Sequence, residues 1–451
     1  MKRLISILFS GTVPRNYWVL FSTGTIEAWC LISFLQYRRR TMDYTRREFI
    51  GMVSAAAALT GVACGAEESG GSADALAGDD PLGVRPDFPV VSEGIYLNSP
   101  YITPSPRQAI EAAQAFLEAK ARDPISLGNM LGETTAARQK YAQLIGASEA
   151  EVSMLFATSD GENVVTRALD LKQGDNVVID DLHYTTTYVL YSHLRKTRGI
   201  DLRIVKNKDG AATPEAFAEL VDDRTRLISV SWISHVNGYH HDLKALADLA
   251  HAHNAYLYAD SIQGTGMVTL DAGATGIDFF TSGTYKWLLG GYGVAPFYVR
   301  EELMDLITPD RLGGLSVANE LENHEFELHS DARKHIYATL GFGSVFQLSA
   351  ALDYLLKVGV ENIERHTVAL AHRIHQGLTD QGYRVNTPAG NRSAIVAFWH
   401  DKEVEKVKAA MESARIKFSF REDNTQIRVG PALFNNGSEI DRFLEVTGSL
   451  A

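Results

Sequence analysis

Three polar residues in the second half of the chain could act together on one small ring. Asp260 ends the apolar stretch 255–260, Gln263 follows shortly after it, and Lys286 follows the next apolar stretch, 278–283. A buried carboxylate can keep a ring nitrogen protonated, an amide can hydrogen-bond a phenolic oxygen, and a desolvated lysine can form an imine. These are the requirements of pyridoxal phosphate. Taken singly, the same residues could be a helix cap, a polar loop residue and a surface lysine.

A phosphate site is predicted at residues 157–169, "ATSDGENVVTRAL". Small polar residues open this stretch, and Val164, Val165 and Ala168 form the apolar face of the helix that follows. A helix N-terminus offers free amides and a favourable dipole to an anion. The alternative interpretation of the polar residues is ordinary helix capping.

Elements that could position these residues alternate along the chain. The stretches 176–180, 226–234, 255–260, 278–283 and 295–299 are nearly all apolar, as strands buried on both faces are. Between them, segment 242–254 has a helical apolar stripe behind a candidate N-cap, Asp242. This alternation predicts a mostly parallel sheet covered by helices. Ligands of such sheets bind at the carboxyl ends of strands, where Asp260 and Lys286 fall.

Composition narrows the classes of function. The chain has 451 residues, enough for two domains, and a net charge of -12, which disfavours nucleic acid as a partner. Its two cysteines, Cys30 and Cys64, both precede the folded body, which therefore has no disulfide, thiolate metal site or cysteine nucleophile. His240 and His241 lack further ligands at a suitable spacing, so we expect solvated histidines and no metal site.

The motifs "ADSIQGTG" (259–266) and "DFFTSGTYKWLLGGYGVAPFYV" (278–299) resemble the class V aminotransferase family of pyridoxal-phosphate enzymes. That family includes cysteine desulfurases, kynureninase and isopenicillin N epimerase. The resemblance begins near Tyr96, in "IYLNSPYITPSP" (95–106), and runs to the C-terminus. It implies the PLP-dependent transferase fold, fold type I (aspartate aminotransferase-like). We accordingly expect a large, mostly parallel-sheet domain over residues 91–340 and a smaller α+β domain over residues 341–451.

The resemblance also implies roles for the cofactor residues. Lys286 would be the Schiff-base lysine and the proton shuttle, Asp260 would pair with the ring nitrogen, and Gln263 would bond the ring oxygen. Either His183 or Tyr184 would stack on the ring, and the resemblance leaves open which. The phosphate contacts would come from Thr158 and Ser159, with further hydroxyl contacts from Ser282, Thr284 or Tyr285.

Substrate and subunit contacts are implied in the same way. Arg428 would grip the substrate carboxylate with a bidentate fork, and Arg421 is a second candidate for that task. His235 stands where relatives carry an asparagine and could approach the cofactor or the substrate. Thr339 would reach the phosphate of a neighbouring subunit, which implies a homodimer with shared active sites.

The reaction is narrowed by the missing cysteine. Cysteine desulfurases need a mobile cysteine to take up sulfur, and the body of this chain has none. Transamination, epimerisation and C–S or C–C bond cleavage of an amino acid remain. An aminotransferase is our leading hypothesis because it needs only the residues already named. An epimerase or a lyase is the alternative, and a non-catalytic PLP-binding protein is a third.

The N-terminal region carries a predicted export signal. Residues 45–64, "TRREFIGMVSAAAALTGVAC", have paired arginines before a short apolar run and resemble a twin-arginine signal. The run is too short to span a membrane comfortably. We therefore assign 42–64 to the signal and 65–90 to a flexible linker. The protein is expected in the periplasm or elsewhere outside the cytoplasm, where Cys64 could carry a lipid as its membrane tether. Residues 1–41 are expected to be a non-native or disordered extension, with translation starting at Met42.

Overall fold

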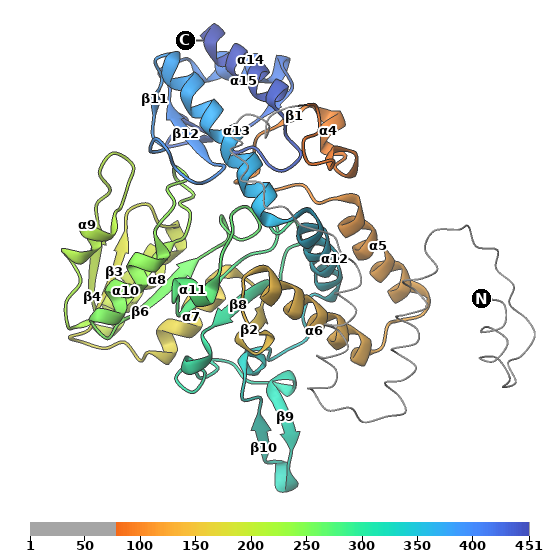
Figure 1. Ribbon diagram of the computed structural model, residues 1–451. Coiled ribbons are helices and arrows are strands. Elements are labelled where there is room, and N and C mark those ends of the chain that lie inside the picture. Colours follow the sequence, from red (N-terminus) through yellow and green to blue (C-terminus); the bar gives the residue numbers. More distant parts are fainter. Residues whose placement is uncertain (1–77, 451) are drawn as a thin grey trace, which may run out of the picture. The chain divides into compact units, whose positions relative to one another are not determined.

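The computed structural model describes residues 78–450 (Figure 1). The predicted extension 1–41, the twin-arginine-type signal 42–64 with Cys64, and residues 65–77 of the linker 65–90 lie outside the described residues. Export and lipidation therefore stay predictions. The other half of that linker, 78–90, is described, and its Val84 and Phe88 are buried in the hydrophobic core instead of forming a flexible tether. Within the described part of the chain, no helix has the length and apolar character needed to cross a bilayer.

A seven-stranded sheet forms the centre of the larger domain, in the order β2-β8-β7-β6-β5-β3-β4. Only β8 runs antiparallel to its neighbours, so the predicted mostly parallel sheet is confirmed. The strands are β2 (Val152–Leu155), β3 (Asn176–Asp180), β4 (Asp201–Val205), β5 (Thr225–Ser231), β6 (Tyr256–Asp260), β7 (Phe279–Thr281) and β8 (Ala295–Val299).

Helices bury both faces of this sheet, which is why its strands read as continuous apolar runs. Successive side chains of a strand point to opposite faces. In β3, Val178 belongs to the same core as Leu246 of α10, whereas Val177 belongs to the core of Val165 and Tyr191, from α7 and α8. The helices of this domain are α5 (Arg107–Arg122), α6 (Leu127–Leu144), α7 (Thr158–Ala168), α8 (Thr185–Arg198), α9 (Pro214–Ala218), α10 (Leu243–Ala252), α11 (Ala272–Thr275) and α12 (Phe342–Val358).

The smaller domain is built on a four-stranded antiparallel sheet in the order β11-β12-β15-β14. Its core combines residues of this sheet with Leu370, Ile374 and Phe443 from the helices that pack on it. The strands are β11 (Arg384–Val385), β12 (Val396–Trp399), β14 (Ser419–Arg421) and β15 (Gln426–Val429). The helices are α13 (Val360–Asp380), α14 (Val404–Ser413) and α15 (Gly437–Leu450), so the expected α+β domain is present.

Two segments cross between the domains. Strand β1 (Ile95–Tyr96) pairs in parallel with β13 (Ile416–Lys417), and Leu97 lies in the core of the smaller domain. Helix α12 begins at the boundary predicted near residue 341, but it packs against α5 and α6 and buries Val345 and Leu348 in the core of the larger domain. The smaller domain thus contains a segment from the N-terminal part of the described chain, and α12 packs with the larger domain although it follows the predicted boundary.

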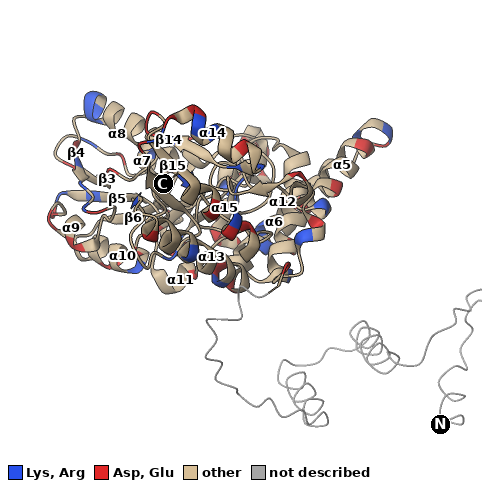
Figure 2. Ribbon diagram, turned by 90° about the horizontal axis from the view of Figure 1, so that it is seen from above, with Lys and Arg blue, Asp and Glu red and all other residues tan. Residues whose placement is uncertain are grey.

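The remaining elements are short. Helix α4 (Val90–Glu93) precedes β1, and β9 (Val317–Glu320) and β10 (Phe326–Leu328) form an antiparallel hairpin that projects from the body in Figure 1. Short 3-10 helices span Arg85–Asp87, Glu149–Glu151, Glu301–Leu303, Gly314–Ser316, Glu322–His324 and Ala332–His335. Helix α5 carries both basic and acidic residues in Figure 2.

Candidate functional site

A cavity of about 350 Å³ lies beyond the carboxyl ends of β6 and β7. It brings together residues predicted from distant parts of the sequence: Thr158, Ser159, Tyr184, His235, Asp260, Gln263, Tyr285 and Lys286. The other lining residues are Phe156, Ala157, Thr186, Ser231, Ile262, Gly283, Tyr292, Gly293 and Val294. The position follows from the topology, because parallel strands end at the same edge of the sheet.

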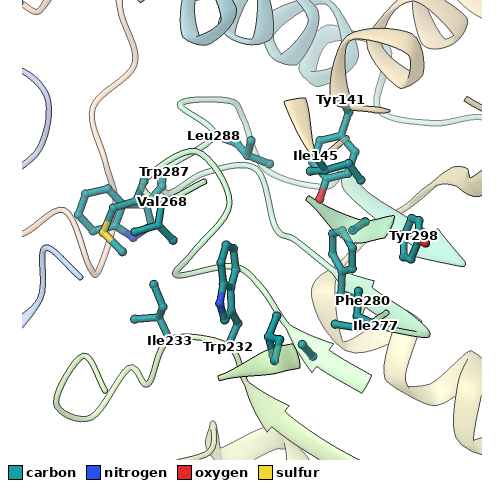
Figure 3. Close-up of a cluster of buried hydrophobic side chains, with 14 of the residues drawn as sticks. Tyr141, Ile145, Trp232, Ile233, Val268, Ile277, Phe280, Trp287, Leu288 and Tyr298 are labelled. Carbon is teal, nitrogen blue, oxygen red and sulfur yellow. The ribbon is translucent and has the colours of Figure 1, made fainter. Parts of the chain in front are cut away.

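Lys286 is held by the loop that follows β7. The next residues, Trp287, Leu288 and Leu289, are buried, and Figure 3 shows Trp287 and Leu288 within a cluster that also holds Val268 and Ile145. On the other side of Lys286, the Thr284 hydroxyl bonds the backbone carbonyls of Gly291 (2.5 Å) and Val294 (3.1 Å). The small and apolar residues around Lys286 therefore fold a tight loop that aims one amine into the cavity.

Burial changes the ionisation of the two groups at the centre of the cavity. It lowers the pKa of Lys286 to about 8; Asp260 opposes this shift, while Arg428 and Arg421 add to it. Burial also raises the pKa of Asp260, against the amide of Ile262, which donates to Oδ1 at 3.0 Å, and the charge of Lys286. A protonated ring nitrogen would give Asp260 a cationic partner, so this carboxylate fits the pyridine end of pyridoxal phosphate.

Gln263 is fixed from two sides. Its Nε2 donates to the carbonyl of Pro100 at 2.8 Å, and its Oε1 accepts from the indole Nε1 of Trp287 at 2.8 Å. A side-chain amide carries two N–H donors. The second N–H of Gln263 thus remains for a ligand in the cavity, which suits the oxygen of the cofactor ring.

The N-terminus of α7 forms the opposite end of the cavity. Its first amides have no partner within the helix, and the hydroxyls of Thr158 and Ser159 lie beside them. Gly283 packs closely here, since a Cβ on it would lie 2.8 Å from Thr158 Oγ1 and 2.6 Å from Ile262 Cδ1. Asp160 caps the amides of Phe156 and Ala157 and pairs with Arg311 at 3.3 Å. Free donors at a helix N-terminus fit a phosphate group.

The other predicted hydroxyl residues have different surroundings. Ser282 and Thr284 are buried, donate to backbone carbonyls and do not line the cavity. Tyr285 does line it and stacks on Tyr292, with ring centroids 4.5 Å apart. Thr339 is exposed just before α12, and its contact with a partner subunit stays a prediction.

Tyr184, rather than His183, lies on the wall of the cavity. Its ring is nearly half exposed and meets the ring of His235 edge to face, with centroids 5.0 Å apart. His183 is buried behind it, where Nδ1 accepts from the Tyr184 amide at 2.8 Å and lies 3.2 Å from the Ser231 hydroxyl. Burial lowers the pKa of His183 to about 4, so this imidazole is neutral at physiological pH.

A buried polar network lies behind the cavity and was not predicted from the sequence. Nε2 of His183 lies 3.2 Å from the Ser229 hydroxyl, which donates to Glu162 at 2.6 Å, and Thr187 donates to the other oxygen of Glu162 at 3.0 Å. Burial raises the pKa of Glu162 to about 7. The available signals were a carboxylate within the apolar face of α7 and hydroxyls in an otherwise apolar strand, β5.

Arg428 and His235 approach each other at the rim of the smaller domain. Arg428 is buried, and its Nη1 donates to the carbonyl of His235 at 2.5 Å. Its Nε and the Nδ1 of His235 have no hydrogen-bond partner among the described residues. Burial, with the charges of Arg421, Arg428 and Lys286, holds the pKa of His235 well below its usual range. An anion is the natural missing partner of Arg428.

The histidine pair at 240–241 was wrongly expected to be solvated. His241 is fully buried, with its Nε2 3.2 Å from an oxygen of Asp180, and Nε2 of His240 accepts from the Trp232 indole at 2.9 Å. His241 therefore lies in the interior, whereas His240 is half-buried and held by the Trp232 indole. No group of three or more histidine, cysteine or acidic residues within residues 78–450 is arranged to hold a metal ion.

The chain resembles curated proteins over most of its length. A probable cysteine desulfurase of Methanothermobacter thermautotrophicus is 29% identical over 65% of this chain and 74% of its own. An uncharacterized aminotransferase of Bacillus subtilis is 26% identical over 68% and 81%, and a cysteine desulfurase of Escherichia coli is 26% identical over 81% and 96%.

Solved structures share the fold. The apo cysteine desulfurase of Thermococcus onnurineus superposes with a TM-score of 0.74 and 22% identity, covering 83% of this chain and 99% of its own. A cystine C–S lyase solved with cysteine persulfide gives a TM-score of 0.74 and 19% identity, covering 80% and 99%. The model of the family "Aminotransferase class-V" matches residues 95–431, which contain the cavity and Arg428. The chain therefore belongs to the class V aminotransferase family of pyridoxal-phosphate enzymes, and its cofactor is pyridoxal phosphate.

Proposed function

We propose that the protein is an aminotransferase that acts on an amino acid through Lys286. The observation that carries this proposal is the meeting of one amine of depressed pKa, Lys286, with one carboxylate, Asp260, in a cavity beside the buried arginine Arg428. An aminotransferase needs these groups and no further acid or base. A relative of 26% identity is also named an aminotransferase.

Each group has a distinct task in this proposal. Arg428 binds the substrate carboxylate through the edge of its guanidinium that His235 leaves free. Lys286, neutral above a pH of about 8, accepts a proton at Nζ and returns it. Asp260 balances positive charge at the far end of the cavity. When bound, pyridoxal phosphate supplies an aldehyde for the substrate amine and a ring that accepts electrons.

Cleavage of a C–S bond by elimination is a second candidate. Several relatives are named cysteine desulfurase, and one solved neighbour is titled a cystine C–S lyase. Residues 78–450 contain no cysteine to carry a persulfide. Elimination without an enzyme thiol remains compatible with the residues of the cavity, because it too needs an amine, a carboxylate and an arginine.

One experiment separates these reactions. The protein loaded with pyridoxal phosphate is mixed with single amino acids and an added 2-oxo acid in deuterated water, and the products are followed by proton NMR. We expect the acceptor to become an amino acid, and Lys286→Ala to abolish this transfer while Lys417→Ala, at an exposed position, preserves it. Release of ammonia and a thiol, measured in samples of the same mixture by colorimetric assay, with the acceptor untouched would establish the lyase, and appearance of the opposite enantiomer on a chiral column would establish an epimerase.

We also propose that the protein is an exported homodimer. The export proposal rests on residues 42–64, and the dimer proposal on the match of Thr339 to the family pattern. Sedimentation of the purified protein and fractionation of cells producing the full chain test them. A monomer that retains full activity, or a full-length chain confined to the cytoplasm, would contradict the respective proposal.

A further inference from the structure

Two arginines of the smaller domain lie on one face of its sheet, next to the cavity. Strands β14 and β15 pair antiparallel, with Ser419 opposite Arg428 and Arg421 opposite Gln426. Paired residues share a face, and so do residues two apart on one strand. Arg421 and Arg428 are therefore diagonal neighbours on the same face. The Cα atoms of such neighbours usually lie about 7–8 Å apart. The opposite face carries Ile427 and Val429 and packs into the domain core.

Neither guanidinium has an acidic partner in the part of the chain that the structure describes. Arg421 is half-buried, yet its side chain forms no hydrogen bond or ion pair there. Arg428 is buried, and its bond from Nη1 to the His235 carbonyl leaves its Nε without a partner. Most other arginines of the smaller domain are engaged: Arg373 pairs with Asp441 and Arg392 with Glu364. Two adjacent cations without carboxylates are costly unless a ligand supplies the anions.

Both arginines act on the cavity. Their positive charges lower the pKa of Lys286 and of His235. The pKa of Arg428 is itself lowered, first by burial and then by the charge of Arg421. His235 lines the cavity and contacts the ring of Tyr184. A ligand that lies between Lys286 and the smaller domain therefore faces two guanidinium groups rather than one.

We propose that Arg428 and Arg421 form a two-arginine subsite whose substrate is an amino acid with a second carboxylate on its side chain. The inference rests on the proposed function in that Arg428 takes the carboxylate next to the reacting carbon. Arg421, one diagonal step away, takes the distal carboxylate. An amino acid with an apolar or cationic side chain would leave Arg421 beside Arg428 without an anion, so the site discriminates against it.

Binding of non-reacting acids tests the subsite. The cofactor-loaded protein is titrated by calorimetry with glutarate, which has two carboxylates, and with butyrate, which has one. We expect glutarate to bind more tightly. Arg421→Gln should weaken the binding of glutarate by roughly tenfold to a hundredfold, the range for losing a hydrogen-bonded charge partner. The affinity for butyrate should stay nearly unchanged. Arg421→Lys, which keeps the charge without the fork, should restore part of the affinity.

The controls separate this subsite from other roles of Arg421. Arg195→Gln removes a positive charge at an exposed position of α8 and should change the affinity for neither glutarate nor butyrate. Equal weakening of glutarate and butyrate by Arg421→Gln would overturn the proposal, because Arg421 would then share the first carboxylate. Equal affinity of the unaltered protein for both acids would overturn it as well. Because neither acid has an amino group, these outcomes are independent of whether amino transfer is observed.

Discussion

The indole nitrogen of Trp287 donates a 2.8 Å hydrogen bond to Oε1 of Gln263, and so joins the residue after Lys286 to the loop after Asp260. Both side chains are buried. The bond orients the Gln263 amide, because an occupied Oε1 forces Nε2 toward Pro100 and the cavity. Trp287 thereby sets the position of two cofactor-binding residues at once.

Trp287→Phe should therefore weaken both stability and cofactor binding. The buried Oε1 of Gln263 loses its donor, which costs about 1–3 kcal/mol of unfolding free energy. Urea unfolding and titration with pyridoxal phosphate measure the two effects. Trp399→Phe, in β12 of the smaller domain, is the matched control and should leave cofactor affinity unchanged. Equal cofactor affinity in the unaltered protein and in both variants would show that the indole does not orient Gln263.

The reactivity of Lys286 should follow its lowered pKa. Only the neutral amine reacts with an acylating reagent, so modification of the cofactor-free protein should rise with pH around a midpoint near 8. An ordinary lysine has a pKa of 10.5. Arg428→Gln removes a neighbouring cation that disfavours the charged amine, and should move the midpoint to higher pH. Mass spectrometry of the peptide containing Lys286 gives both curves; an unchanged midpoint in the variant would contradict the assigned coupling.

Glu162 should make the stability of the protein fall as the pH rises through neutrality. Its pKa is raised from 4.5 to about 7 in the folded state, so the folded protein binds more protons than the unfolded one between these values. The stabilisation is complete below pH 4.5 and is lost as the pH rises through about 7. At about 1.4 kcal/mol for each pKa unit, the effect amounts to a few kcal/mol.

Glu162→Gln tests this dependence because the amide oxygen can still accept from Ser229. Unfolding free energies measured from pH 4 to 8 should lose the slope that Glu162 contributes. Glu412→Gln, at an exposed position of α14, should leave the slope in place. The same pH slope of the unfolding free energy in the unaltered protein and in both variants would show that another group titrates.

Gly283→Ala should lower cofactor affinity more than stability. The added methyl group would meet Thr158 Oγ1 and Ile262 Cδ1 at distances well below van der Waals contact, and so displace a predicted phosphate-binding hydroxyl. Gly132→Ala in α6 is the matched control, since nothing lies within 4 Å of its added Cβ. Equilibrium titration with pyridoxal phosphate, followed by absorbance, compares the two variants. A full-affinity Gly283→Ala protein would remove Thr158 from the phosphate site.

Tyr184 and His183 should respond differently to substitution. Tyr184→Leu removes an exposed ring from the cavity wall, so cofactor affinity should fall several-fold with little change in stability. His183→Leu leaves the Tyr184 amide and two serine hydroxyls without their partner and should cost about 1–3 kcal/mol of unfolding free energy. The reverse pattern, in paired unfolding and binding measurements, would assign the ring-stacking role to His183.

The sequence predicted the sheet well because its strands are buried on both faces. Strands β3 and β8 occupy the predicted residues 176–180 and 295–299, and Asp242 caps α10 by accepting from the Ala245 amide at 3.0 Å. The predicted strand 226–234 ends earlier, at Ser231, because the chain beyond it turns back toward His240 and His241. A continuous run of apolar residues predicts where a strand lies, but it does not show where the strand's backbone hydrogen bonds to its neighbours end.

Side-chain directions outside regular strands could not be predicted. His183 and Tyr184 lie in the loop before α8, where no periodicity tells which ring faces the cavity. The shared face of Arg421 and Arg428 depends on the register of two strands too short to show an alternating pattern. Glu162 looks misplaced on an apolar helix face until Thr187 and Ser229, distant in sequence, supply its partners.

The pairing of Ile95 with Ile416 has a consequence for biosynthesis. Strand β1, the first strand among the described residues, is hydrogen-bonded to β13, which is synthesised near the end of translation. The smaller domain therefore cannot complete its fold until almost the whole chain has been made. Closing so large a loop is slow relative to local contacts. A carrier or chaperone that recognises incomplete chains would therefore have a long interval in which to engage this one.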